Sequence, residues 1–423
     1  MSTGTDVDVV VVGAGVAGLA AAHALGRGGF RVLVLDKQRE VRPIAKGELL
    51  QPGAITVLQG WGVVDGLLAD GALRVPALVA RDHEGEALLT MDYRTLLDAE
   101  RPWLLVHDYH VILGALARDL PASVEVRRGA VVRELLRDGD GRARGVRLDG
   151  GDVTAALVVA ADGLSSRLRK DAGIELARAE YPHKLAAFDL ADQPVGEDVS
   201  TYATPRGLAM SYSLPGDRAR LYVQVSADEL RGVDREKAQD WVDGFVRQVP
   251  AFAGKRADVL RAWNGKQVLP VGRSLTESLS GKGIVLLGES AHAVHPAAGQ
   301  GMNSSIVNAA RLADRVAALE GDLAPARLDP VLAAWSDERR RALLHVATTS
   351  HSATRMITDL SPVGRALGRR ALRKTGGNRR LTYTIMHNMS GLGQHALRPL
   401  DRLHQLGVLP DPRGGQLPGW ARR

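Results

Sequence analysis

The sequence predicts an α/β fold, in which a parallel sheet with covering helices is combined with a second sheet-based domain and a helical C-terminal region. Short apolar, β-branched runs at residues 9–12, 156–160 and 283–287 are typical of buried parallel strands. Between the last two runs, over about 173–271, the pattern changes to several strands and a single helix, which indicates another sheet. A length of 423 residues exceeds the size at which one core usually keeps growing, so we expect more than one domain.

The chain begins with a strand–helix–strand unit. After the strand at 9–12, a helix is expected from about 16 to 25, and residues 31–36 supply a second buried strand. Glycines in the intervening loop have GxGxxG spacing, and an acidic residue closes the second strand; this pattern is typical of a Rossmann-like dinucleotide site. The candidate binding residues of this unit are Gly13, Ala14, Gly15, Val16, Ala17, Gly18, Asp36 and Lys37.

The remaining elements follow in order. A helix opens at Pro52, antiparallel strands are expected over 77–93, a helix over 110–117 and three short strands over 124–148. The buried run at 156–160 shows that the first domain is interrupted rather than contiguous. The second domain is expected to hold strands at 184–190, 208–214 and 220–225 and a helix at 235–249.

The chain then returns to the first domain through the strand at 283–287 and a helix at 303–319, and it is helical and basic after residue 334. The predicted boundaries are therefore 1–172 and 273–335 for the two parts of the first domain. The second domain covers 173–272, and the basic helical C-terminal region covers 336–423.

Two further patches accompany the glycine loop: ADGLSSRLR at 161–169 and GESAHAVHPAAGQGMN at 288–303. Alone, each is ambiguous, since an Asp-Gly turn can merely end a strand while Ser165 caps the next helix. In order and spacing, the three patches together resemble the fingerprints of single-component flavoprotein monooxygenases of the p-hydroxybenzoate hydroxylase type, over about residues 6–335.

This resemblance implies an FAD-binding Rossmann-like first domain and an enzyme that uses NADPH or NADH as a transient electron donor. Such an enzyme transfers one oxygen atom of O2 to a hydrophobic small molecule through a flavin C4a-hydroperoxide. The protein would contribute position, electrostatics and exclusion of water rather than a nucleophile.

The resemblance also assigns residues. The second patch matches the family motif completely, with Arg169 bracing the loop, whereas in the third patch Glu289 replaces the usual aspartate whose carboxylate binds a ribityl hydroxyl of FAD. The following loop would bring a helix N-terminus to the flavin, where its dipole stabilises negative charge. The implied FAD-binding residues are Asp162, Gly163, Arg169, Gly288, Glu289, Pro296, Gly299, Gly301, Met302 and Asn303. Among them, Pro296, Gly299 and Gly301 are also the candidates for direct participation in catalysis.

His292 and His295 lie in the third patch and are acid–base candidates. The alternative is structural, because a histidine at a strand-to-helix turn more often serves packing. No metal site is predicted, since two nearby histidines without a third ligand at matching spacing do not make one.

The segment GELLQPG at 47–53 is similar to the corresponding segment of squalene epoxidase and related polyether epoxidases. The similarity implies that Glu48 and Gln51 reach the flavin or its ribityl chain; alternatively, Gln51 caps the helix opened by Pro52. This segment favours epoxidation of an isoprenoid alkene, whereas the rest of the family favours hydroxylation of an aromatic polyketide, phenol or quinone. Both reactions stay open.

One departure from the family concerns the head of the helix at 110–117. Family members often place an FAD-contacting arginine there, and this chain has Tyr109 and His110 instead. Lys46, Lys37 or Arg39 would have to supply the positive charge.

The sequence also bears on three other functions. An FAD-dependent reductase of isoprenoid double bonds, similar to geranylgeranyl reductase, shares the glycine loops, but the His292 and Pro296 pattern argues against it. A flavin-dependent halogenase should carry WxWxIP, whereas Trp263 stands alone. A nucleic-acid-binding protein is disfavoured because aromatic residues are only 4% and the basic residues gather in one tail.

Charge and composition indicate where in the cell we expect the protein to act. Residues 351–423 hold 13 Lys and Arg against 3 Asp and Glu, so the net charge of +7 is a property of the C-terminal region. Its basic, partly apolar segment at 363–380 is compatible with peripheral membrane contact, or with helices that merely cover the first domain. With no cysteine and no recognisable signal peptide, we expect a cytoplasmic protein, as a monomer or homodimer.

Overall fold

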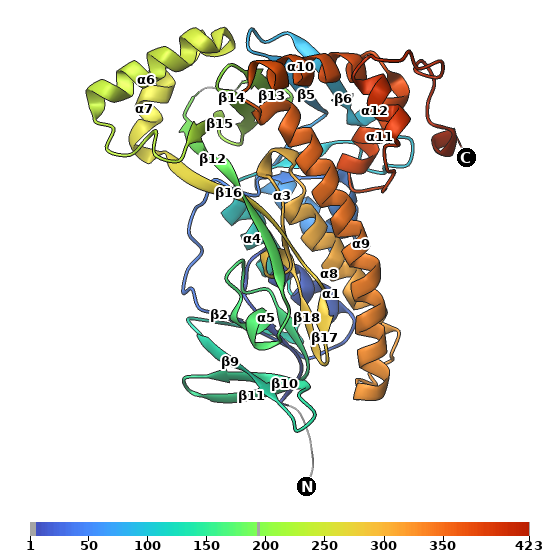
Figure 1. The fold of residues 1–423 in the computed structure, drawn as a ribbon. Helices are drawn as coiled ribbons and strands as arrows, with labels where there is room; N and C mark the ends of the chain where they lie inside the picture. Colours follow the sequence, from blue (N-terminus) through green and yellow to red (C-terminus); the bar gives the residue numbers. More distant parts are fainter. Residues whose placement is uncertain (1–5, 193–194, 423) are drawn as a thin grey trace.

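The structure is a computed structural model that describes residues 6–192 and 195–422. This part of the chain forms two large sheets stacked end to end, with a long C-terminal helix running beside both (Figure 1). A small third sheet, made of β3 (Leu49–Leu50), β7 (Leu104–Val106) and β4 (Leu73–Val75), lies between the segments that link them. The α/β fold class predicted from the sequence is confirmed.

The first sheet has the strand order β17–β18–β11–β1–β2–β8. Its central strand β1 (Val7–Val12) pairs in parallel with β2 (Val32–Asp36) and with β11 (Gly151–Ala160), and β11 pairs in parallel with β18 (Ile284–Leu286). The edges are β8 (Val124–Arg128) and β17 (Ser280–Gly281), while β9 (Val132–Arg137) and β10 (Ala143–Leu148) form an antiparallel extension of β11. Because parallel strands share one carboxyl edge, the segments after β1, β2, β11 and β18 meet there.

Helices cover the first sheet because its strands are apolar on both faces. The packed helices are α1 (Val16–Arg27), α2 (Pro52–Gly60), α3 (Val63–Ala69), α4 (Tyr109–Arg118), α5 (Arg167–Asp171) and α8 (Gly301–Ala317). Leu19 of α1 and Ile306 of α8 are fully buried with Val10 and Val158 of the sheet in one apolar core. The predicted βαβ unit and the predicted return of the chain after residue 283 are both found.

The second sheet has the order β19–β16–β12–β15–β14–β13–β5–β6. Its strands are β19 (His292–Ala293), β16 (Gln267–Thr276), β12 (Leu176–Leu190), β15 (Arg218–Ser226), β14 (Gly207–Leu214), β13 (Val199–Thr204), β5 (Ala77–Asp82) and β6 (Ala87–Asp92). Helices α6 (Arg235–Gln248) and α7 (Arg256–Ala262) pack on one face around Phe188 and Phe245. The opposite face meets the first domain and the C-terminal helices.

Residues 77–93 form the expected antiparallel pair, but β5 pairs in parallel with β13 and so extends the second sheet. The predicted boundaries had assigned this pair to the first domain. The reason is physical: a strand's partner depends on long-range packing, and β13 follows β5 by more than a hundred residues. The positions of the domain boundaries, after residues 172, 272 and 335, therefore remain predictions.

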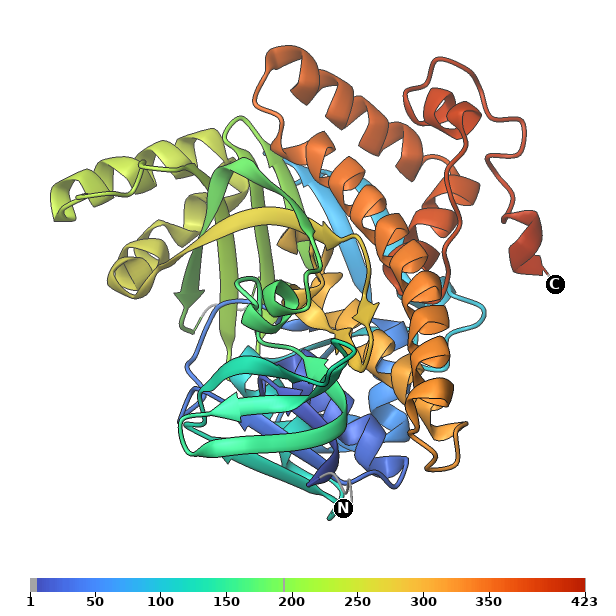
Figure 2. The same cartoon turned by 60° about the horizontal axis from the view of Figure 1, so that its bottom comes forward.

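The C-terminal region is helical, as predicted, with α9 (Pro325–Thr358), α10 (Pro362–Gly376), α11 (Arg379–Met389) and α12 (Pro399–Gln405). Figure 2 shows α9 spanning the side of the molecule, with the later helices at one end of the second sheet. Leu381, Tyr383 and Met386 of α11 are buried, the last two against that sheet. None of the helices in the described ranges combines the length and apolar character needed to cross a bilayer.

Candidate functional site

The glycine loop lies at the carboxyl end of β1 and opens α1. Gly13 has φ +106°, and a Cβ there would lie 2.3 Å from the carbonyl oxygen of Ala161. A Cβ on Gly18 would lie 1.8 Å from the carbonyl oxygen of Gly13, so α1 approaches the turn as closely as glycine permits. Val16 and Ala17 form the first turn of α1, which has neither a side-chain cap nor an acidic residue.

Asp36 closes β2 beside this loop. One of its carboxylate oxygens accepts a 2.7 Å hydrogen bond from the backbone N–H of Ala14, and the other accepts one of 2.7 Å from Gln38 N. The structure therefore brings the predicted acid to the glycine loop. Lys37, the next residue, is exposed.

The Asp-Gly turn after β11 is braced as the motif implies. Arg169 Nη1 donates to the carbonyl oxygens of Leu164 at 3.1 Å and Ser290 at 3.2 Å, which ties this turn to the third patch. Asp162 Oδ2 accepts from Arg167 N, whereas Asp162 Oδ1 is buried and has no partner among the described residues. The helix cap is made by Ser166 rather than Ser165, since Ser166 Oγ accepts from Arg169 N at 3.0 Å.

Gly288 and Glu289 follow β18 at the same edge. Gly288 has φ +66°, and a Cβ there would lie 2.6 Å from Ala17 Cβ, so the turn is pressed against α1. Glu289 is half-exposed and forms an ion pair with Lys46, which comes from the segment before β3. Lys37, Arg39 and Lys46 were the candidates for the positive charge. Of these, Lys46 pairs with a predicted site residue, Glu289.

The loop of residues 296–303 connects these turns to α8 and is held by Asn303. Its Oδ1 accepts a 2.7 Å hydrogen bond from Gln51 N, and its Nδ2 donates to Leu49 O at 2.9 Å. Pro296 is exposed, Gly299 has φ +58°, and Gly301 and Met302 open α8, whose first turn has no side-chain cap and no acidic residue.

Gln51 precedes α2 but does not cap it with its side chain. The hydroxyl of Tyr93 donates to Gln51 Oε1 at 2.9 Å, and Gln51 Nε2 is buried without a partner among the described residues. A Cβ on Gly299 would lie 3.5 Å from this Nε2, so the free donor borders the 296–303 loop. Tyr93 was not found from the sequence, because nothing local links it to Gln51.

Glu48 behaves differently from the expectation that it reaches the flavin. Its side chain is fully buried and accepts hydrogen bonds from Arg220, Tyr212 and Tyr222 of the second sheet. Because three donors of the second sheet enclose this fully buried carboxylate, we assign Glu48 to the contact between the sheets.

Tyr109 stands at the head of α4, where an arginine was expected. A Cβ on Gly15 would lie 3.6 Å from its hydroxyl oxygen, and one on Gly47 would lie 3.1 Å from its ring. Burial raises the pKa of Tyr109, so its hydroxyl is neutral at physiological pH. The phenol therefore supplies a polar group beside the glycine loop, but no charge.

The two histidines of the third patch are both buried. His292 Nε2 lies 3.1 Å from Ser304 Oγ, and burial lowers the pKa of His292 to about 4. His295 Nε2 lies 3.0 Å from Nε2 of His183 in β12, and burial, with the nearby histidines, lowers the pKa of His295 to about 3. Both rings are thus neutral near pH 7. No group of three His, Asp or Glu that could hold a metal ion occurs in the described residues.

A cavity of about 670 Å³ opens next to His183, between the second sheet and the end of α9. This size suits a drug-sized molecule. The cavity is lined by residues of β12, β15 and β16 on one side and of α9 and the following turn on the other. Its polar lining includes Tyr181, His183, Arg206, Gln224, Arg273, His351 and Arg355.

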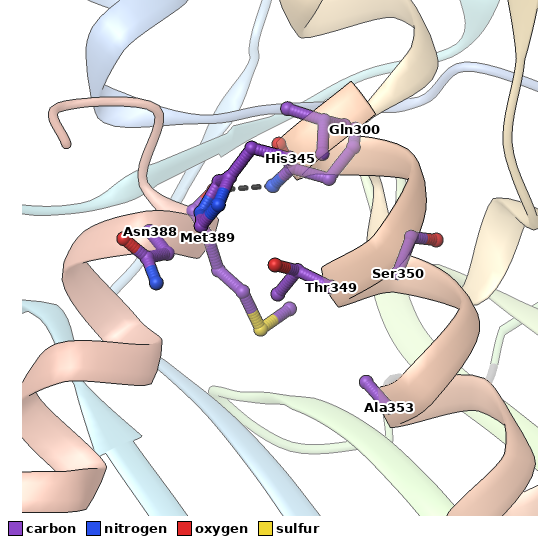
Figure 3. A pocket seen from close by; sticks show the side chains of 8 residues that line it. Gln300, His345, Thr349, Ser350, Ala353, Asn388 and Met389 are labelled. Atoms are coloured by element: carbon purple, nitrogen blue, oxygen red, sulfur yellow. Dashed lines mark hydrogen bonds between the residues drawn. The ribbon is translucent and has the colours of Figure 1, made fainter. Parts of the chain in front are cut away.

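A second cavity, of about 10 Å³, lies between Gln300, the middle of α9 and the end of α11 (Figure 3). It has room for about one water molecule, and so cannot admit a substrate. Gln300 Nε2 donates to the carbonyl oxygen of Met389 at its edge, which fixes the 296–303 loop to α11.

Comparison with known proteins agrees with this geometry. The family described as FAD binding domain matches residues 6–350. Among curated proteins, the chain is 28% identical to 6-methylpretetramide 4-monooxygenase of Streptomyces rimosus, over 80% of this chain and 82% of that protein. It is 26% identical to para-nitrophenol 4-monooxygenase of Pseudomonas sp. (strain WBC-3), over 83% of this chain and 86% of that protein.

Among solved structures, the chain is similar to P. aeruginosa PqsL in complex with 2-aminobenzoylacetate. The TM-score is 0.74 and the identity 27%, over 84% of this chain and 97% of that chain. Because it covers 84% of this chain, the similarity extends beyond the first sheet.

Proposed function

The chain belongs to the FAD binding domain family and is an FAD-dependent monooxygenase, and we propose that it hydroxylates a hydrophobic aromatic molecule. The observation that carries the choice of substrate is the large cavity next to His183. Its lining includes tyrosine, histidine, glutamine and arginine side chains, which suit an aromatic substrate with a polar substituent. An isoprenoid alkene, the substrate favoured by GELLQPG, would leave these polar side chains without a hydrogen-bond partner.

The residues at the carboxyl edge of the first sheet fit FAD. The first turns of α1 and α8 carry no acidic residue and no side-chain cap, so their N–H groups and dipoles favour anionic groups. Gln51 Nε2 and Asp162 Oδ1 are buried polar atoms that no described residue satisfies. Buried polar groups are normally hydrogen-bonded, so these two atoms are available to bind a cofactor at this edge.

We assign the binding roles accordingly. The glycine loop with Val16 and Ala17 would hold the pyrophosphate, and Asp36 the adenosine ribose. The rest of FAD, its ribityl chain and flavin ring, would be held by the Asp162–Arg169 turn, by Glu289 with Lys46, and by the 296–303 loop with Gln51. When bound, FAD supplies the redox chemistry, with electrons from NADH or NADPH and with O2 as the oxygen source.

The protein's own contribution is positioning and electrostatics. The N-terminus of α8 stabilises negative charge near the 296–303 loop by about 0.3–2 kcal/mol. Asn303 fixes that loop to the segment before α2, and Gln300 fixes it to α11. Because both rings are uncharged near pH 7, neither His292 nor His295 supplies an imidazolium acid there.

Peripheral contact with an anionic membrane is part of the proposal. Leu360, Val363 and Leu367, around the start of α10, are exposed large apolar side chains, and Arg369 and Arg373 follow them. Basic residues beside exposed apolar ones favour anionic lipid surfaces. The cytoplasmic location and the monomeric or dimeric state stay predictions.

The test is the visible spectrum of the protein supplied with FAD, followed anaerobically after NADH or NADPH and then in air. Bleaching by a nicotinamide and reoxidation in air support the proposal. A hydroxylated product from an aromatic substrate would then separate this function from epoxidation. Failure to bind FAD would contradict it. Bleaching by neither nicotinamide, even with aromatic substrates present, would also contradict it.

A further inference from the structure

A chain of hydrogen bonds connects the 296–303 loop to the large cavity. His295 Nδ1 accepts a 3.2 Å hydrogen bond from the backbone N–H of Ala297, which places the single ring proton of neutral His295 on Nε2. That Nε2–H lies 3.0 Å from Nε2 of His183 and donates to it. The ring proton of His183 must therefore be on Nδ1. The backbone of the loop thus fixes the tautomers of both rings, as an orienting partner does for a metal-bound histidine.

We propose that His183 is the residue that selects the substrate, by donating its Nδ1–H to an oxygen atom of the bound aromatic molecule, and that His295 is the positioning residue that holds His183 in this tautomer. The inference rests on the proposed function and deepens it, because it names the substituent that the substrate must carry. His183 lines the cavity, and Nδ1 is the ring nitrogen that His295 leaves free.

The surroundings keep the pair neutral. Burial lowers the pKa of His183, and it lowers the pKa of His295 to about 3. Tyr181, on the same strand, has its ring 5.5 Å from that of His183, and its hydroxyl lies 2.9 Å from His351 Nδ1 on α9.

The charged groups of the cavity act in the same direction. Arg273 of β16 and Arg355 of α9 also line the cavity, and their positive charge, with burial, lowers the pKa of the neighbouring His351. The carboxylates at the rim are already paired: Glu229 with Arg206, Glu180 with Arg178, and Asp359 with the backbone and hydroxyl of Ser361. Beside these arginines, His183 offers the substrate a neutral, oriented N–H donor.

Such a donor recognises an acceptor oxygen, either the oxygen of a phenol or phenolate or a ring carbonyl. A hydrocarbon of the same shape would leave the buried N–H of His183 without a partner, and that loss costs affinity. The site therefore discriminates between an oxygenated aromatic ring and a plain one.

The test uses 1-naphthol and naphthalene as matched probes, with FAD-loaded protein and no nicotinamide, so that no turnover occurs. We expect wild type to bind 1-naphthol more tightly, by about 3- to 10-fold in Kd, the range of one hydrogen bond. His183→Leu should bind the two probes equally. His183→Asn, whose amide can place an N–H near the position of Nδ1, should keep part of the preference.

A second measurement needs no ligand. The 15N signals of His183 in FAD-loaded protein should report the Nδ1–H tautomer, and His295→Leu should turn them into a mixture. His295→Gln, which retains a donor near Nε2, should keep the wild-type signals. Normal FAD binding in each variant shows that it is folded.

Equal or absent binding of the two probes by wild type would overturn the inference, as would a preference that survives His183→Leu or an Nε2–H tautomer of His183. These results are distinct from a failure of the proposed function. That failure would appear as a wild-type protein that does not bind FAD or is not reduced by a nicotinamide.

Discussion

Glu48 and Arg220 join the first domain to the second sheet across 172 positions of sequence, through a 2.8 Å hydrogen bond from Arg220 Nη2 to Glu48 Oε1. Tyr212 and Tyr222 also donate to the carboxylate, so the buried charge is surrounded by donors. Arg218 continues the network by pairing with Asp108, just before α4. This network fixes how the strand of GELLQPG meets the sheet that lines the cavity.

Replacing Glu48 by alanine should destabilise the protein by about 3–5 kcal/mol, because it removes the carboxylate that hydrogen-bonds the buried Arg220 and leaves, among the described residues, only Asp108 and Asp189, each at 3.7 Å. Urea unfolding measures this loss. The matched control is Asp149→Ala, which removes an exposed ion pair with Arg133 and should leave the unfolding free energy nearly unchanged. A milder Glu48→Gln variant should retain wild-type FAD affinity; a large loss there would contradict our assignment of Glu48 to the domain contact.

Gly18→Ala should weaken FAD binding, because the new Cβ would lie 1.8 Å from Gly13 O. The glycine loop would have to shift, at a cost of about 1–3 kcal/mol. FAD fluorescence quenching gives the Kd. Gly114→Ala is the control: this glycine is exposed on α4 with nothing near its Cβ position, and alanine should stabilise the helix by about 0.5–1 kcal/mol. Equal FAD affinity of both variants would count against the role of the loop.

Stability should fall on mild acidification because of His292. Burial lowers the pKa of His292 to about 4, against about 6.5 when unfolded, so between these values the unfolded chain binds more protons. The free energy of unfolding therefore rises with pH, and His292 contributes about 3 kcal/mol that is lost as pH falls from about 6.5 to about 4. Urea unfolding between pH 5 and 7 should show a smaller slope for His292→Gln. An unchanged slope would contradict the prediction.

The parts of the site that were predictable share one property: their spacing is local. The glycine loop with Asp36 and the turn from Asp162 to Arg169 each form within a few dozen residues, so the motif spacing determines the geometry. The contacts that hold the 296–303 loop are not local. Gln51 and Asn303 are 252 positions apart, and Lys46 and Glu289 are 243 apart.

Two other contacts between distant residues could not be predicted from the sequence. No pattern near Glu48 shows that Arg220 will meet it, because that contact depends on how β3 packs against the second sheet. His183 stands in an ordinary strand, and its link to His295 exists only because β12 passes the 296–303 loop. The contact between His183 and His295 is therefore visible only in the folded structure.

Membrane contact through α10 has a direct test. Val363 and Leu367 are 69% and 48% exposed and lie one helical turn apart, so V363D/L367D should abolish flotation with phosphatidylserine-containing vesicles. FAD affinity should not change. Leu400→Asp on α12, 49% exposed, is the control and should still float. Point variants are preferable to truncation, since removing α11 would uncover the second sheet. Flotation retained by V363D/L367D would exclude this surface.

The free donor on Gln51 gives the sharpest test of where FAD lies. Tyr93 donates to Gln51 Oε1 at 2.9 Å and thereby fixes which end of the amide faces Gly299. If Nε2 donates to FAD, Gln51→Leu should raise the FAD Kd by up to about tenfold, the range of one hydrogen bond. Gln51→Glu should bind worse still, because it offers an acceptor where the cofactor needs a donor. Tyr93→Phe should have a smaller effect, since the amide can then rotate. Equal FAD affinity of Gln51→Leu and wild type would mean that the donor is satisfied by water, and that the 296–303 loop alone positions this end of the cofactor.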